Sequence, residues 1–141
     1  MRNEKYPLIG IISLFLIFSV TNVSAQTDFQ AFWVKFKSAI KKGDKTAVAA
    51  MSNFPVNMPA YQKNVKTKAD FARRYNHIFN GEANASQCFA KAKPQKRDSK
   101  TYEVYCPFKQ TPDDWTNAPI NYYFVLTKTG WKFAGLDNIN E

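Results

Sequence analysis

The pattern of apolar and polar positions changes twice along the chain. Residues 8–20 form a continuous apolar run, and between residues 29 and 79 the apolar positions recur at helical spacing. From residue 85 onward, apolar and polar positions mostly alternate, which is typical of strands. The pattern therefore predicts an apolar leader, a helical first half and a strand-rich second half.

Three helices are predicted in the first half. The first covers residues 29–42, where apolar side chains form one stripe along the helix: Phe29, Phe32, Trp33, Phe36 and Ile40. A short second helix is expected at residues 45–51 and a third at residues 68–80. Two prolines exclude a helix between these last two, so we expect a loop with at most a short strand at residues 54–65.

Four strands are predicted in the second half, arranged as two hairpins. Residues 86–93 and 101–108 flank a polar, basic turn and form the first hairpin. Residues 120–127 and 131–136 flank a glycine-containing turn and form the second. The sequence therefore predicts an α+β domain with about three N-terminal helices packed on a curved antiparallel sheet of four or more strands.

Residues 1–25 match a secretory signal peptide. Arg2 and Lys5 precede the apolar run, and Val23-Ser24-Ala25 supplies small residues at the cleavage site. The run is shorter than the roughly 20 residues that cross a bilayer as a helix. We predict cleavage after Ala25, with an uncleaved anchor as the alternative, and a single secreted or periplasmic domain at residues 26–141.

Cys88 and Cys106 are the two cysteines of the chain. In a first hairpin centred on Arg97 they lie directly opposite each other, at a spacing that a disulfide bond can bridge. An exported chain meets an oxidising compartment, so we predict a structural disulfide that contributes roughly 3 kcal/mol. The sequence shows no metal-ligand cluster and no cofactor motif, and we expect neither a metal nor a cofactor.

The chain is basic, with 20 Lys and Arg against 11 Asp and Glu and a formal net charge of +9. This charge favours anionic partners such as an envelope surface, although we prefer the simpler interpretation of a solvated basic surface. The basic end of the first hairpin lacks interleaved aromatic side chains, which argues against nucleic acid as the partner: Lys91, Lys93, Lys96, Arg97 and Lys100.

The order of elements over residues 28–138, closed by Gly130-Trp131-Lys132-Phe133-Ala134-Gly135-Leu136, resembles the cystatin-like cone superfamily. This group contains nuclear transport factor two, ketosteroid isomerase and polyketide cyclases. The resemblance implies a cone with a pocket between the helices and the concave sheet, and pairing of two copies through their sheets. The tyrosine that ketosteroid isomerases carry on the first helix has no counterpart here, and no acid aligns with their catalytic aspartates. Function is therefore not inherited from the fold.

Candidate site residues are few. Five aromatic side chains are candidates for lining a ligand pocket, although their spacing also fits an ordinary core: Trp33, Tyr61, Tyr75, Tyr105 and Phe133. Glu103 is the one weak catalytic candidate, because a carboxylate facing inward could act as acid or base, but we expect it to be exposed. His77 falls on the polar side of its helix and is expected at the surface.

Three functions remain open at this stage. The leading hypothesis is an exported, non-catalytic binding module for a small apolar molecule or a partner protein. One alternative is a small isomerase-like or cyclase-like enzyme that uses an inward carboxylate. The other is an interaction protein whose basic hairpin docks on an anionic envelope surface.

Overall fold

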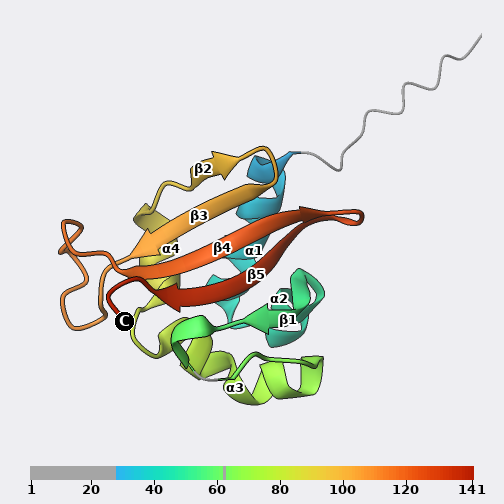
Figure 1. Ribbon diagram of the computed structural model, residues 1–141, viewed down its shortest axis with the longest axis horizontal. Helices are drawn as coiled ribbons and strands as arrows, with labels where there is room; N and C mark the ends of the chain where they lie inside the picture. Colours follow the sequence, from blue (N-terminus) through green and yellow to red (C-terminus); the bar gives the residue numbers. More distant parts are fainter. Residues whose placement is uncertain (1–27, 62) are drawn as a thin grey trace, which may run out of the picture.

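The computed structural model describes residues 28–61 and 63–141. It contains an open, five-stranded sheet in the order β1-β5-β4-β3-β2, with helices α1 and α4 behind the sheet and α3 beyond the β1 edge (Figure 1). The helices are α1 (Phe29–Lys42), α2 (Lys45–Ala50), α3 (Lys68–Asn80) and α4 (Ala85–Lys91), with a 3-10 turn η1 (Pro59–Tyr61). The strands are β1 (Ser52–Asn57), β2 (Gln95–Asp98), β3 (Thr101–Cys106), β4 (Ile120–Thr127) and β5 (Gly130–Asn138). The predicted signal peptide lies outside the described residues.

The three predicted helices are confirmed, and each begins at a side-chain cap. Asp28 accepts a hydrogen bond from the backbone nitrogen of Gln30 at 2.9 Å, and Thr67 accepts one from that of Asp70 at 3.1 Å. Such caps satisfy backbone donors that have no partner within the helix. Gly43 ends α1 with φ of 65°, a left-handed conformation that glycine adopts without steric cost.

The predicted strand at residues 86–93 is wrong. This segment forms helix α4, whose start is capped by Asn84 through a hydrogen bond from the backbone nitrogen of Gln87 at 3.1 Å. The strand that pairs with β3 is instead β2, which lies inside the predicted turn. The register centred on Arg97 is therefore also wrong, since the sheet partner of Cys106 is Ile120.

The predicted disulfide is present, but it joins different elements. It links Cys88 of α4 to Cys106 at the end of β3, with a Cα–Cα distance of 5.7 Å. Both cysteines are buried. The bond thus fixes a helix onto the sheet rather than two strands to each other, and a buried disulfide fits an extracellular or periplasmic protein.

The sheet is mixed, whereas the sequence predicted an antiparallel one. β1 forms within the segment that was expected to be largely loop, and it pairs in parallel with β5, placing Ser52 beside Phe133. The other strand pairs are antiparallel. Because β1 lies between α2 and α3 in the chain, this parallel pair joins the helical half to β5 of the strand-rich half.

Aromatic side chains fill the space between the helices and the sheet. Phe36 of α1, Phe124 of β4 and Phe133 of β5 are each 0 % exposed. The ring centre of Phe36 lies 5.2 Å from that of Phe124 and 5.8 Å from that of Phe133. This side of the sheet is a packed core. Among the helices of the described residues, none has the length and apolar character needed to cross a membrane.

Candidate functional site

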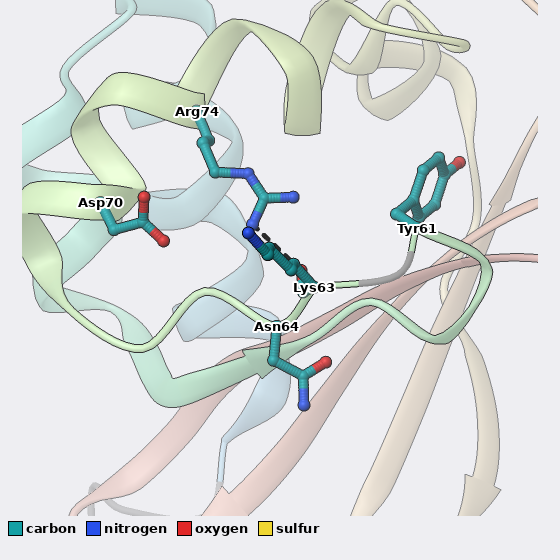
Figure 2. A pocket seen from close by; sticks show the side chains of 5 residues that line it. All are labelled: Tyr61, Lys63, Asn64, Asp70 and Arg74. Carbon is teal, nitrogen blue, oxygen red and sulfur yellow. Dashed lines mark hydrogen bonds between the residues drawn. The ribbon is translucent and has the colours of Figure 1, made fainter.

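A polar cleft of about 540 Å³ opens between α3 and the segment that follows η1 (Figure 2). It is lined by Tyr61, Lys63, Asn64, Asp70 and Arg74. Figure 2 shows Arg74 reaching from α3 to the backbone of Lys63, with Tyr61 on one side and Asp70 on the other. Its volume lies within the range of about 300–1,000 Å³ that is usual for ligand sites.

Backbone pairing and one asparagine hold the wall of the cleft in place. Val56 of β1 and Val65 exchange two backbone hydrogen bonds of 2.8 and 2.9 Å. Asn64 accepts a hydrogen bond from the backbone nitrogen of Met58 at 2.9 Å. On the opposite wall, Asp70 and Arg74 are four residues apart on α3, so their side chains lie on the same side of the helix. Hydrogen bonds to β1 and to Met58 therefore position Asn64 and Val65 beside the cleft.

The cleft has unsatisfied positive charge. Nη1 of Arg74 donates to the carbonyl oxygen of Lys63 at 3.0 Å and Nη2 donates to Sδ of Met58 at 3.8 Å, so within the described part of the chain the remaining guanidinium N–H groups are available. Asp70 is paired with Arg73 at 3.3 Å, and in the described part of the chain the Lys63 ammonium forms no ion pair. Since one carboxylate is already paired and two cations remain, the cleft favours an anion.

A second polar cluster surrounds the hydroxyl of Tyr61. The hydroxyl donates to the Glu82 carboxylate, and Nδ2 of Asn138 lies 3.4 Å from each of the two carboxylate oxygens. Burial, followed by the hydrogen bond to Glu82, raises the pKa of Tyr61. The ring of His77 packs edge-on to that of Tyr61 at 5.5 Å. The Tyr61 hydroxyl is thus engaged with Glu82, while its ring forms part of the cleft wall.

The structure does not bring the five predicted aromatic residues to one site. Trp33, Tyr75 and Phe133 are buried in the core. Tyr105 lies on the sheet face that points away from the helices, because the neighbouring Cys106 points to α4. Only Tyr61 lines the cleft. His77 is exposed, as predicted.

Glu103 is neither exposed nor directed into the core. Its side chain is 11 % exposed and lies on the outer sheet face, where it pairs with Nη1 of Arg97 at 3.0 Å. It also accepts hydrogen bonds from the hydroxyl of Tyr105 at 2.9 Å and from Nδ2 of Asn121 at 3.3 Å. Burial, followed by the hydrogen bond to Glu103, raises the pKa of Tyr105. The expectation that Glu103 is exposed is wrong, because this network covers it.

The sequence reasoning missed most of the cleft and the neighbouring cluster: Lys63, Asn64, Asp70, Arg74, Glu82 and Asn138. One signal was available, since Asp70 and Arg74 share a side of the predicted third helix. Glu82 and Asn138 are 56 residues apart in the chain, and no local pattern connects them. Within residues 28–61 and 63–141, no group of three or more His, Cys, Asp or Glu side chains is placed to hold a metal ion.

No protein-family model matches the chain, and no curated protein matches it significantly. Solved structures that are similar to it include two with a TM-score of 0.43. A candidate scytalone dehydratase from Novosphingobium aromaticivorans is 9% identical, and the match covers 77% of this chain and 78% of that one. A domain of unknown function with a cystatin-like fold from Nostoc punctiforme is 13% identical, with 86% of this chain and 80% of that one covered. Neither likeness carries an argument about function. The chain resembles the cystatin-like cone superfamily in fold, through its own order of helices and strands.

Proposed function

We propose that the protein is an exported, non-catalytic binding module that holds a small organic anion in the cleft between η1 and α3. The observation that carries this proposal is the Arg74 guanidinium, which has free donors beside the Lys63 ammonium. A guanidinium binds a carboxylate or phosphate through two parallel hydrogen bonds. The ring of Tyr61 adds an apolar surface for the rest of the ligand. The signal-peptide pattern and the buried disulfide support export.

The packed core argues against an apolar ligand inside the cone. Such a ligand would displace rings such as Phe36 and Phe124, which are fully buried and in contact with each other. A protein partner is the other occupant that the sequence left open, and an acidic segment would meet the same two cations. The open, polar cleft favours the small anion, since its lining residues lie within one short stretch and one helix.

The geometry does not support the enzyme alternative. An isomerase-like or cyclase-like reaction of this kind needs a carboxylate directed into the space between helices and sheet. Glu103 faces the other way and is held by Arg97, Tyr105 and Asn121. A binding module needs no carboxylate in that space, so it agrees better with the outward position of Glu103.

The test compares Arg74 with Lys68, an exposed basic residue on the same helix. Native mass spectrometry of the protein from its source compartment would report a retained ligand, and titration with succinate, benzoate and phosphate would measure affinity directly. We expect Arg74→Gln to weaken binding by roughly tenfold or more, because a charge-assisted hydrogen bond contributes about 1.5–3 kcal/mol.

Lys68→Gln is the matched control, because it removes the same charge from an exposed side chain of α3 that does not line the cleft and is not the ion-pair partner of Asp70. We expect it to change affinity by less than about threefold. An equal loss of affinity in the two variants would show that anions are attracted by the overall charge of the protein rather than by the cleft. No binding of any of the three anions by the wild-type protein would contradict the proposal.

A further inference from the structure

Helix α1 presents unpaired positive charge on the side that faces away from the sheet. Lys35, Lys41 and Lys42 are exposed, and neither α1 nor α4 contains an acidic residue. In the part of the chain that the structure describes, no lysine of α1 forms an ion pair. Lys37 is placed over the ring of Trp33 at 5.5 Å instead. The charge of α1 is therefore available to a partner outside the protein.

An exposed apolar side chain lies between these lysines. Val34 is 61% exposed, which makes it one of the few large apolar side chains at the described surface. At about 100° per residue, Lys35 and Lys42 project on one side of Val34, and Lys37 and Lys41 project on the other. The outer side of α1 thus combines a central apolar position with a cation pair on each flank.

Two shallow grooves with largely apolar linings border this helix. One, of about 240 Å³, lies between α1 and α4, with Phe89 and Ala90 in its lining and Lys37 and Lys41 at its border. The other, of about 410 Å³, lies between α1 and α2 and includes Val34, Ala47 and Met51, together with Lys35, Lys42 and Asp44. Each groove therefore has apolar walls beside ammonium groups.

We propose that α1 docks on a membrane surface that contains anionic phospholipid. The four α1 lysines contact lipid phosphates, Val34 enters the interface, and the two grooves take adjoining apolar groups of the lipid. The lysines of α1 favour an anionic surface because their charge is complementary to it. The exposed Val34 and the apolar grooves beside it favour a lipid surface over a soluble polyanion, because only lipid offers apolar groups to contact them. This surface is separate from the cleft at η1 and from the basic hairpin that the sequence first indicated.

The first test measures binding to vesicles of phosphatidylcholine alone and with one-third phosphatidylglycerol. We expect binding only to the anionic vesicles, and a decrease as salt rises. The variant Lys37→Gln/Lys41→Gln should bind roughly twentyfold more weakly, since each lysine near an anionic surface contributes about fivefold. The matched control is Lys96→Gln/Lys100→Gln on the β2–β3 hairpin, which removes the same charge and should bind within about threefold of wild type.

Two results would overturn the proposal. One is an absence of binding to the anionic vesicles, and the other is an equal loss in the two double variants, which would indicate attraction by overall charge alone. Arg74→Gln should bind vesicles normally, so failure of the cleft and failure of the α1 surface are distinguishable.

A second variant separates lipid from soluble polyanions. Val34→Ser should weaken vesicle binding about threefold or more and leave binding to inorganic polyphosphate unchanged, because only the lipid interface takes up the valine. Circular dichroism would verify that the variant is folded, as expected for an exposed position. Unchanged vesicle binding by Val34→Ser, together with strong polyphosphate binding, would assign the surface to a soluble polyanion and contradict the proposal.

Discussion

The two faces of the sheet follow the same alternation along the strands, yet they are buried by different means. On the helix face, Tyr122 and Phe124 alternate into a core of packed rings. On the outer face no described helix covers the strands, and Glu103 is buried by the Arg97, Tyr105 and Asn121 side chains that bind it. Side chains on the helix face are buried by close packing of aromatic rings, whereas Glu103 on the outer face is buried by the side chains that hydrogen-bond to it.

The difference bears on the two binding sites that we propose. Among the described residues, close-packed rings occupy the space between helices and sheet in which the fold resemblance implied a pocket. The polar features with free donors lie at the η1–α3 cleft and on α1 instead. A cone fold can thus use its interior for stability and its periphery for recognition.

The largest expected effect is on the helix face. Phe36→Ala should lower the free energy of unfolding by about 3–5 kcal/mol, because it removes a fully buried ring and leaves a cavity among Phe124 and Phe133. Urea denaturation followed by circular dichroism would measure the loss. Phe32→Ala, on the same helix but only partly buried, is the control and should cost less. A loss below about 1 kcal/mol for Phe36→Ala would mean that this core is not close-packed.

The disulfide is the next largest contribution, since it attaches α4 to the sheet. The variant Cys88→Ala/Cys106→Ala should lower the free energy of unfolding by about 3 kcal/mol. Wild-type protein in reducing agent should unfold at the same urea concentration as the double variant, and the variant should not respond to reducing agent. If full reduction left the urea midpoint of the wild type unchanged, the predicted contribution of the disulfide to stability would be contradicted.

Substitutions on the outer face should lower the free energy of unfolding by less. The loss should also differ between the two members of the ion pair, Glu103 and Arg97. Glu103→Gln should cost about 1–2 kcal/mol, because the hydrogen bonds from Tyr105 and Asn121 lose their charged acceptor. Arg97→Ala should cost under about 0.5 kcal/mol, since the arginine side chain is 67% exposed. Equal costs would show that the ion pair, rather than the buried network, stabilises this face. Native mass spectrometry of the wild-type protein would test the pairing of two copies through their sheets that the fold resemblance implies.

Tyr122 has a modest effect at neutral pH, and this effect diminishes in alkali. Tyr122→Phe should cost about 1 kcal/mol, because the hydroxyl donates to the Ile78 carbonyl oxygen at 3.0 Å. Burial raises the pKa of Tyr122 above its ordinary value of 10.0, so the folded protein keeps the proton where the unfolded chain loses it. This contribution is complete below pH 10 and is lost as the pH rises further. Urea midpoints from pH 8 to 11 should therefore fall less steeply for Tyr122→Phe, and identical slopes would contradict the burial effect.

The long helices were predictable because their periodicity coincides with their packing. The stripe of Phe29, Trp33 and Phe36 is the face that α1 buries. Helix α4 was misread as a strand because seven residues show barely two turns. Asn84 with Gln87 three positions later carried the signal of a helix start, and Cys88 and Phe89 have helical spacing after Ala85.

The candidate site was far less predictable than the fold. The contact of Tyr61 with Glu82 spans 21 residues and that of Glu82 with Asn138 spans 56, so neither leaves a local pattern. The burial of Glu103 depends on partners from β2 and β4 as well as β3. Strand alternation predicted its face relative to Cys106 but not the side chains that cover it. The local periodicity of the sequence indicates which face of a helix or strand is buried. A site depends on contacts between distant segments, which local periodicity does not indicate.

The position of β5 has a consequence for when the protein can fold. β5 follows the other four strands in the chain, yet it lies between β1 and β4 and is the parallel partner of β1. During synthesis β1 lacks its strand partner until β5 has emerged, so the sheet cannot be completed before then. For the exported protein that we propose, this order of events keeps the domain incompletely folded until β5 has been made.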